Sequence, residues 1–337
     1  MKAWILANKF GIDELELTDI ATPTPSRDQV LVRVRAASLN YHDLMVINGH
    51  YGAPPPKRLV PIADGAGEIV AVGDAVTRVK VGDRVAGNFA QRWISGRADL
   101  ATIFGSTLGS PRDGMLAEYV LLDGDGAVKI PDHLSFEEAS TLPIAGVTAW
   151  HALFGEHTLE PGSTVLVQGT GGVAMFALQL AGLAGARVIV TSGSEEKGAR
   201  ARECGADEVI NYKQTSAWDT RVLELTDGVG VDLVVDMAGG DMRRSINATR
   251  WGGRVSLVGL LESGQARFDI VPFMTKKLTI QGVAVGPRIM FEELNIAIAT
   301  KRLHPLIHHT YAFDEAKAAL SDLTQAKHVG KLVIRGA

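Results

Sequence analysis

The sequence predicts an α/β protein in which a doubly wound parallel sheet is inserted into a split domain built mainly of short strands. Three observations support this prediction. A glycine turn joins an apolar strand to an apolar helix near the middle of the chain, strands and helices alternate around it, and the outer segments return to strands separated by turns. We expect residues 1–128 and 271–337 to form the strand-rich domain and residues 129–270 to form the doubly wound domain.

The glycine turn is the most informative part of the chain. An apolar, β-branched run, Ser163–Gln168, has the length of one strand, and Gly169–Ala174 follows it directly. An apolar helix continues to Leu183, and Arg187–Thr191 is typical of the next parallel strand. This order is the dinucleotide-binding fingerprint in its Gly-x-Gly-x-x-Ala form, and the free N–H groups at the helix start suit phosphates. The turn residues expected to touch the nucleotide are Gly169, Thr170, Gly171, Gly172 and Val173.

The end of the second strand indicates which nucleotide is bound. An NAD site usually places Asp or Glu about 20 residues after the first glycine, where it accepts from the ribose hydroxyls. Here Ser192 stands in that region without an acid, Lys197 follows on the next helix, and Tyr212 ends the strand Glu208–Tyr212. A cation and hydroxyl donors suit a phosphate dianion, so we expect NADPH in preference to NADH. The alternative makes Lys197 a solvated helix residue and Tyr212 a half-buried strand end.

The composition agrees with a soluble enzyme of two domains. The chain has 337 residues and a formal net charge of −4, with 34 basic and 38 acidic residues spread along it, which indicates no surface for nucleic acid or anionic membrane. No apolar run reaches the roughly 18–20 residues that span a bilayer, and the N-terminus does not resemble a signal peptide. The single cysteine, Cys204, cannot form an intramolecular disulfide, which favours a cytoplasmic setting.

The outer segments have the pattern of a β-rich domain. Short apolar runs alternate with turns such as Gly73-Asp74, and Ser135–Glu138 has the form of a capping box that starts a helix. We expect a ligand cleft between this domain and the nucleotide domain. The elements expected outside the central unit are strands at Gln29–Ala36, Ala66–Val72, Asp83–Gly87, Leu116–Leu122, Leu278–Val285 and Lys331–Arg335, and a helix at Asp314–Leu323.

A resemblance to a known family rests on motifs that span nearly the whole chain. The chain resembles the medium-chain dehydrogenase/reductase superfamily, and its quinone oxidoreductase branch in particular. The resemblance implies a GroES-like catalytic domain, a Rossmann domain for NADP(H) and a dimer or tetramer. The motifs that carry it, besides the glycine turn, are Ala36–Asp43, Asp64–Gly67, Val81–Val85, Leu142–Trp150 and Gly330-Lys331.

The family also contains zinc enzymes, so the zinc-ligand positions decide the branch. The resemblance places Asn40 where the zinc enzymes have their first cysteine ligand and Ala63 where they have a histidine. Neither side chain is a competent zinc ligand. An unorthodox site built from His42, Asp43 and Asp64 is disfavoured, because neighbouring side chains tend to diverge. We expect a metal-free enzyme.

Without a metal, orientation and a few hydrogen-bond donors must assist hydride transfer, which suits a quinone or an α,β-unsaturated carbonyl. Asn40 is the best candidate, because its amide can donate to a cofactor ribose or to the substrate oxygen. Tyr41 and Tyr51 are expected to orient the substrate or to donate a proton, although Tyr51 could also simply cover a surface. The resemblance places Thr148 beside the nicotinamide, with a helix-interior hydrogen bond as the alternative.

Several strand ends complete the expected cofactor site. Ligands sit outside the carboxyl ends of the strands in a doubly wound sheet, where backbone groups could hold the nicotinamide carboxamide, although each also has an ordinary strand-end explanation. The segment 88–109 is aromatic enough to shape a substrate pocket or to pack against the barrel. The additional residues expected at the cofactor are Ala238, Gly259, Leu260, Val283, Val285 and Lys331.

Two other functions remain open. The first is a zinc-free alcohol or aldehyde dehydrogenase of the same superfamily, which would need a proton acceptor that the sequence does not clearly supply. The second is a non-enzymatic NADPH-binding protein, like the lens crystallins or adaptors derived from this superfamily. The intact glycine turn argues against the non-enzymatic role. The lack of a clear proton acceptor favours an NADPH-dependent reductase of small carbonyl or quinone substrates over the dehydrogenase, which shares the cofactor.

Overall fold

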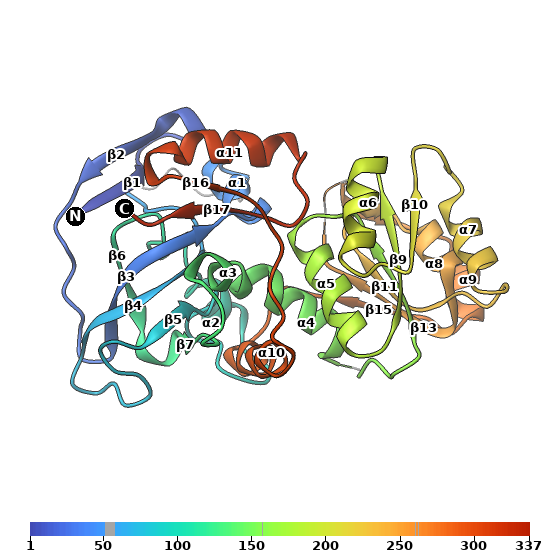
Figure 1. Cartoon of the computed structure of the whole chain (residues 1–337), viewed down its shortest axis with the longest axis horizontal. Helices are drawn as coiled ribbons and strands as arrows, with labels where there is room; N and C mark the ends of the chain where they lie inside the picture. The colour runs from blue at the N-terminus through green and yellow to red at the C-terminus, as the bar shows by residue number, and fades with distance from the viewer. Residues whose placement is uncertain (51–57, 157, 260, 262) are drawn as a thin grey trace. The chain divides into compact units, whose positions relative to one another are not determined.

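The computed structural model describes residues 1–50, 58–156, 158–259, 261 and 263–337. The chain divides into two compact units, which Figure 1 shows in colour order. Unit 1 consists of Met1–Val147 and Val285–Ala337, and unit 2 consists of Thr148–Ala284. Residues 129–147, assigned to the nucleotide domain from sequence, therefore fall in unit 1, and residues 271–284, assigned to the catalytic domain, fall in unit 2.

The described residues of unit 2 form a six-stranded sheet in the order β10-β9-β8-β11-β13-β15, and all its neighbours are parallel. The order reverses beside β8, so crossovers of one hand place helices on both faces. Figure 1 shows α5 and α6 in front of the sheet. The strands are β8 (Thr164–Gln168), β9 (Arg187–Ser192), β10 (Glu208–Asn211), β11 (Val231–Asp236), β13 (Thr249–Leu257) and β15 (Thr279–Gly282), with β12 (Gly239–Asp241) and β14 (Ser263–Arg267) paired separately.

The central strand of this sheet explains why the unit forms. Val165, Leu166 and Val167 of β8 are fully buried, as a parallel strand covered on both faces requires. A core of residues from the strands and from α7 and α8 continues across the sheet. The helices of unit 2 are α4 (Val147–Phe154, whose first residue belongs to unit 1), α5 (Gly172–Leu183), α6 (Glu195–Glu203), α7 (Trp218–Leu225), α8 (Arg243–Ala248) and α9 (Ile270–Thr275).

Unit 1 is mainly β. Its described residues form a sheet in the order β16-β17-β3-β4-β5-β7, with β6 also paired to β3, so the first and last parts of the chain share one sheet. The long strand β3 pairs with β4, β6 and β17. The strands are β1 (Lys2–Leu6), β2 (Leu15–Asp19), β3 (Gln29–Ser38), β4 (Asp64–Val72), β5 (Arg84–Gly87), β6 (Tyr119–Asp123), β7 (Ala127–Lys129), β16 (Ile307–Tyr311) and β17 (Lys331–Arg335).

The helices of unit 1 pack around a large apolar core that includes Leu6, Ile69 and Leu122. The predicted capping box is present, because Ser135 Oγ accepts from the Glu138 backbone N–H at 3.1 Å and the Ser135 N–H donates to the Glu138 carboxylate at 2.8 Å. The helices are α1 (Tyr41–Ile47), α2 (Leu100–Phe104), α3 (Phe136–Ser140), α10 (Arg288–Lys301) and α11 (Ala316–Gln325), with a π-helical turn η3 (Leu142–Gly146) and short 3-10 turns η1 (Ile12–Glu14), η2 (Gly124–Gly126) and η4 (Phe313–Glu315).

The predicted fold class is confirmed: a Rossmann sheet is inserted into a split, β-rich domain. The predicted strand at Leu278–Val285 is shorter, Thr279–Gly282, and it is the edge strand of the Rossmann sheet. No helix in the described ranges is long and apolar enough to cross a membrane.

Candidate active site

The glycine turn of unit 2 has the geometry of a phosphate cradle. Gly169 has φ +79°, in the left-handed region that favours glycine, and its N–H donates to Thr191 O at 2.9 Å. A methyl group added to Gly169 or Gly171 would meet no heavy atom within 4 Å, so the space beside the turn is open. Gly171 is the N-cap of the 12-residue helix α5 and supplies no side-chain cap, so N–H groups of the first turn can receive a pyrophosphate. These residues fit a dinucleotide.

The ends of β9 and β10 bring the predicted nucleotide-discriminating residues together. Ser192 is buried at the end of β9, where its backbone carbonyl accepts from Tyr212 N at 3.0 Å. A methyl group at Gly193 would lie 2.5 Å from the Tyr212 hydroxyl oxygen, so this oxygen packs over the Gly193 backbone. Lys197 lies in the first turn of α6, and its N–H donates to Ser194 Oγ at 3.2 Å. Backbone geometry thus places the Tyr212 hydroxyl beside Gly193, just before the start of α6.

A second lysine at this point was missed from the sequence. Burial lowers the pKa of the Lys197 ammonium, and the positive charge of nearby Lys213 lowers it further. Two like charges held close together at a strand end are a favourable environment for a dianion. The signal was present in the sequence, because Lys213 directly follows Tyr212, but a side chain's direction after a strand end cannot be predicted from its position alone.

The end of β11 is organised by a buried carboxylate. Asp236 accepts from the N–H groups of Ala238 and Gly239 at 3.1 and 3.0 Å and from Ser245 Oγ at 2.6 Å. A methyl group at Gly259 would lie 1.8 Å from Met237 O, so this position requires a glycine. The predicted residues Ala238 and Gly259 therefore lie at neighbouring strand ends, and both have a structural reason for their conformation.

The structure describes three more of the predicted cofactor residues, each in its own local environment. Thr148 is buried near the start of α4. Val283 follows β15, and its N–H donates to Leu257 O at 2.9 Å. Val285 belongs to unit 1 and has φ +55°, which is unusual for a β-branched residue. Tyr51 and Leu260 lie outside the described residues.

Unit 1 contains a buried polar cluster around Asn40. Its amide Nδ2 donates to Asp64 Oδ2 at 2.9 Å and to Ser38 O at 3.4 Å, and its Oδ1 accepts from Lys331 Nζ at 2.6 Å. Lys331 also donates to Leu39 O at 2.5 Å. Asp43 accepts from Asn40 N at 2.7 Å and from Ala63 N at 2.9 Å. We call Asn40, Asp43, Asp64 and Lys331 the Asn40 cluster.

Local structure explains how the Asn40 cluster forms. Asn40 is the N-cap of α1, and Asp43 closes a capping box with it. Asp64 opens β4 and is the cross-strand partner of Ser38, so it faces the end of β3. Ile144 lies in the π-helical turn at Leu142–Gly146, and its N–H donates to Asp64 Oδ2 at 3.1 Å.

Burial shifts the pKa values of two charged groups in the Asn40 cluster, Asp64 and Lys331. Asp64 is fully buried, and its Oδ1 has no hydrogen-bond partner among the residues that the structure describes. Burial raises the pKa of Asp64 to about 7, while Lys331 and the hydrogen bond from Asn40 oppose the shift. Burial likewise lowers the pKa of Lys331. Asn40 fixes both groups, because its carbonyl must face the ammonium and its amide must face the carboxylate.

These residues do not fit a catalytic zinc. Asn40 is one of the two positions at which the resemblance places a ligand of the zinc enzymes, and the only atom of its side chain that could ligate a metal, Oδ1, already accepts a hydrogen bond from an ammonium. Ala63 has no ligating atom. A divalent cation beside Asn40 would also be repelled by the buried charge of Lys331.

The other predicted residues of unit 1 that the structure describes differ in their burial. Tyr41 is 47% exposed at the first position of α1. The segment 88–109 packs against the start of α10, because Trp93 O and Ile94 O accept from Arg288 N and Ile289 N at 2.9 and 3.1 Å. Within this segment Phe89 is buried, whereas Phe104 is 58% exposed.

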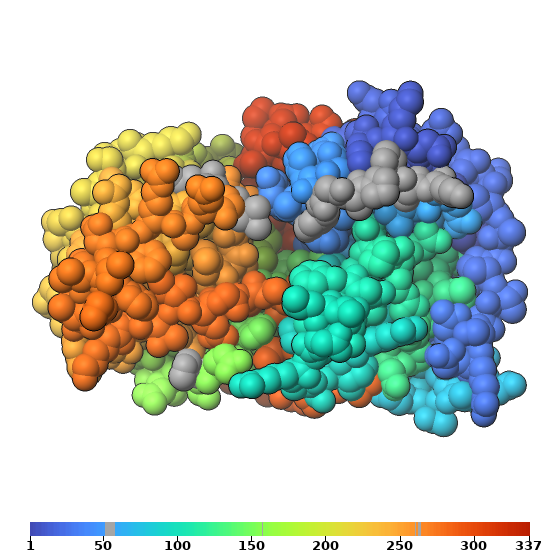
Figure 2. Space-filling model, turned by 180° about the vertical axis from the view of Figure 1, so that it is seen from behind, coloured from blue at the N-terminus to red at the C-terminus, as the bar shows by residue number. Residues whose placement is uncertain are grey.

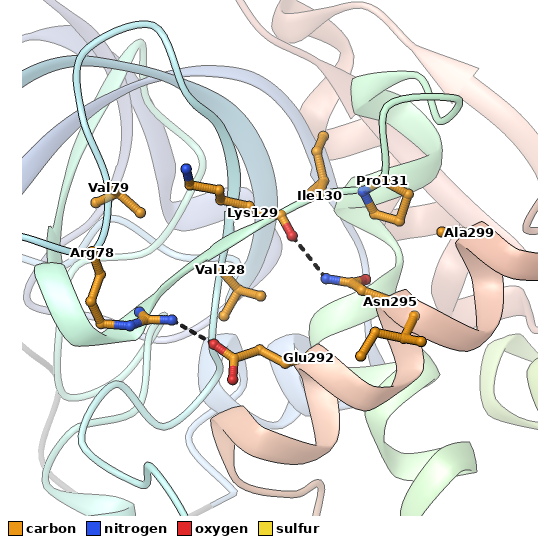
Figure 3. Close-up of a pocket in the computed structure, with 10 residues that line it drawn as sticks. Arg78, Val79, Val128, Lys129, Ile130, Pro131, Glu292, Asn295 and Ala299 are labelled. Atoms are coloured by element: carbon orange, nitrogen blue, oxygen red, sulfur yellow. Dashed lines mark hydrogen bonds and ion pairs between the residues drawn. The ribbon is translucent and has the colours of Figure 1, made fainter.

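A groove of about 360 Å³ lies elsewhere in unit 1, between α10 and the strand β7 (Figure 3). Figure 3 shows an ion pair between Arg78 and Glu292 at one side and a hydrogen bond from Asn295 to Lys129 O at 2.9 Å. None of the predicted site residues lines it. The groove therefore does not coincide with the Asn40 cluster or with the glycine turn.

A Rossmann sheet with an open phosphate cradle, joined in sequence to a GroES-like domain, defines a nicotinamide-dependent oxidoreductase. Comparisons agree. Residues 26–132 match the family model of the alcohol dehydrogenase GroES-like domain, and residues 172–300 match that of zinc-binding dehydrogenases. The chain belongs to the medium-chain dehydrogenase/reductase superfamily.

Relatives extend over the full length. A zinc-type alcohol dehydrogenase-like protein of Schizosaccharomyces pombe is 39% identical over 96% of both chains. A quinone oxidoreductase of Lama guanicoe is 30% identical over 98% of this chain and 96% of its own. The solved structure of an NAD-dependent alcohol dehydrogenase is 33% identical, covers all of both chains and has a TM-score of 0.90.

The Asn40 cluster predicts a specific pH dependence of stability. Folded Asp64 keeps its proton up to about pH 7, whereas the unfolded carboxyl loses it near 3.8. Because the folded chain binds more protons in this window, the contribution of Asp64 to the free energy of unfolding falls as the pH rises from about 4 to about 7. The difference in that free energy, wild type minus Asp64→Asn, should fall by about 1–4 kcal/mol in urea titrations across the window.

Asp74→Asn, at an exposed position of the same unit, is the matched control and should show a difference that stays constant with pH. A wild-type minus Asp64→Asn difference that rises with pH would contradict the prediction, because it would mean that the folded carboxyl is ionised and stabilised by Lys331.

Proposed function

We propose that this chain is a metal-independent, NADPH-dependent reductase of quinones or α,β-unsaturated carbonyls. The observation that carries the proposal is the combination of an open dinucleotide cradle in unit 2 with a cluster in unit 1 that holds an ammonium in place of a metal. The quinone oxidoreductase relative is consistent with this reading. The second candidate function is that of a zinc-free alcohol or aldehyde dehydrogenase, and the relatives named as alcohol dehydrogenases support it.

The chemistry explains why a conjugated acceptor suits this site. When bound, a reduced nicotinamide supplies a hydride. A quinone or an enone takes the hydride at carbon and spreads the negative charge to its oxygen, so it needs less electrophilic help than an isolated ketone. Preorganised donors near that oxygen then lower the barrier. A buried ammonium held by Asn40 and Leu39 adds positive potential without ligating the acceptor.

Asn40 keeps its proposed role in a modified form. One amide hydrogen is held firmly by Asp64 at 2.9 Å, so it is committed within the cluster. The other contacts Ser38 O at 3.4 Å, a long bond that a ligand oxygen can replace. We propose that this second hydrogen is the one donated to a ribose or to the acceptor oxygen, with Tyr41 and Tyr51 as further orienting groups.

The preference for NADPH rests on the strand ends of unit 2. Lys197, Lys213 and the Tyr212 hydroxyl lie close together beside Gly193, and Ser192 replaces the acid that reads a free ribose. A 2′-phosphate would place a dianion beside both ammonium groups, whereas an unphosphorylated ribose would offer them no charge. The proposed preference for NADPH distinguishes this chain from the similar NAD-dependent alcohol dehydrogenase of known structure.

Removal of one lysine tests the cofactor preference. Lys197→Ala should weaken NADPH binding by about 1.5–3 kcal/mol, the usual scale for a hydrogen bond to a charged group, and should change NADH binding little. Fluorescence titration of both nucleotides measures the two affinities, and Lys301→Ala, an exposed lysine of unit 1, is the control. Equal losses for both nucleotides would show that Lys197 does not face the 2′-phosphate.

A substrate panel tests the function itself. Purified protein should oxidise NADPH in the presence of quinones and enones, and NADPH deuterated at one face should pass one deuterium to the carbon skeleton of the enone product. Aldehydes should react slowly and simple alcohols should not be oxidised. Brisk alcohol oxidation with inert quinones and enones would establish the alcohol dehydrogenase reading instead. Nucleotide binding without turnover of any of these compounds would establish the non-enzymatic one.

We further propose that two copies associate through unit 2, in the cytoplasm. Helix α9 has no buried residue although it is largely apolar, and Ile270, Val271 and Met274 are each at least 64% exposed. Figure 2 shows this part of unit 2 in orange at the surface. The adjacent strand β15 ends the described sheet, and its open edge can pair with a second copy about a two-fold axis.

A charge placed on α9 tests this association. Val271→Asp should shift the wild-type dimer to a monomer in light scattering at micromolar concentration, because an aspartate would be buried without a partner. Val229→Asp, at a valine of unit 2 that is 63% exposed, should leave the dimer intact. A monomeric wild type, or a dimer that survives Val271→Asp, would overturn the proposal.

A further inference from the structure

His42 is a titratable side chain that the proposed function does not yet use. It lies in the first turn of α1, two residues after Asn40. Its Nδ1 is 3.7 Å from Asp43 Oδ1, and its ring meets the ring of Phe89 edge-on, with centroids 5.1 Å apart at 83°. The imidazole is thus confined by a carboxylate of its own helix and by an aromatic ring from the segment after β5.

Asp43 is well suited to orient this imidazole. Its side chain is 1% exposed, and its two oxygens accept from Asn40 N at 2.7 Å and Ala63 N at 2.9 Å. Two backbone donors fix the carboxylate, so its position does not depend on a flexible neighbour. A carboxylate beside one ring nitrogen stabilises the protonated ring and favours one orientation of the imidazole. The separation of 3.7 Å is longer than a hydrogen bond, as is common before a ligand tightens such a pair.

The exposure of His42 completes the argument. Its side chain is 20% exposed, whereas every member of the Asn40 cluster is at most 8% exposed. Compared with the Asn40 cluster, the His42 imidazole therefore has both contact with solvent and a restricted orientation. A group that exchanges protons with water and then delivers one to a ligand needs both properties.

We infer that His42 is the proton donor of the reductive reaction, positioned by Asp43. This inference rests on the proposed function. In the step, the hydride that a bound reduced nicotinamide would supply bonds to the β-carbon of the enone, the alkene π electrons form the enolate double bond, and the carbonyl π electrons move to oxygen. The enolate oxygen takes a proton from the imidazolium, whose N–H bond breaks, and water restores the proton on the imidazole through its exposed edge. A quinone would be protonated at the corresponding oxygen.

The experiment compares His42→Gln with His308→Gln, a substitution at an exposed histidine of β16. His42→Gln should lower kcat for an enone about 100-fold, the lower range for a general acid, and should change the NADPH dissociation constant less than two-fold. The wild-type pH profile of kcat should show a limb that is absent from the variant. Added imidazole should restore turnover to His42→Gly in a concentration-dependent manner. His308→Gln should behave as wild type.

A further readout does not need the reductive reaction. If wild type proves inert with enones and quinones, the proposed function fails, but the same imidazole rescue of His42→Gly during alcohol oxidation still tests His42. Turnover of His42→Gln within two-fold of wild type, or a loss that imidazole does not restore, would overturn the inference.

Discussion

The buried ammonium of Lys331 is the constraint on which the polar part of unit 1 depends. A fully buried charge is tolerated only where acceptors and counter-charges surround it. Asn40 Oδ1 and Leu39 O supply the acceptors, and Asp43 supplies a nearby negative charge, to which Asp64 adds only once it loses its proton at about pH 7. The orientation of Asn40, the first turn of α1 and the start of β4 all follow from satisfying this one group. The resemblance places Asn40 where zinc enzymes of the family carry a ligand, so we propose that the same arrangement disfavours a metal.

In unit 2 the hydrogen-bond donors of the glycine turn come from the backbone rather than from side chains. Its turn leaves N–H groups of α5 unpaired and keeps the adjacent space open. The dipole of the helix then favours anions at that point. The nucleotide preference that we propose depends instead on a few side chains at the ends of β9 and β10. This division explains why the glycine turn is easily found in the sequence, whereas the position of the two lysines depends on detailed geometry.

The parts predicted from sequence are those fixed by local patterns. The strand before Gly169, the turn and α5 were predicted because an apolar run, glycines and a second apolar run occur in direct succession. The Ser135 capping box was predicted for the same reason. The sequence did not predict that β15 belongs to the Rossmann sheet, because the residues of an apolar strand do not specify which strand pairs with it. The contact between Asn40 and Lys331 joins residues 291 positions apart, and no local pattern contains it. The conformation of Tyr51 remains outside what the structure describes.

The central claim is that an ammonium, and not zinc, organises the polar site of unit 1. Elemental analysis of protein purified without chelator and then dialysed against zinc, read together with turnover before and after a strong chelator, tests it most directly. The account predicts well under one zinc per chain and unchanged NADPH oxidation after chelation. One tightly held zinc per chain, whose removal abolishes turnover and whose return restores it, would contradict the account.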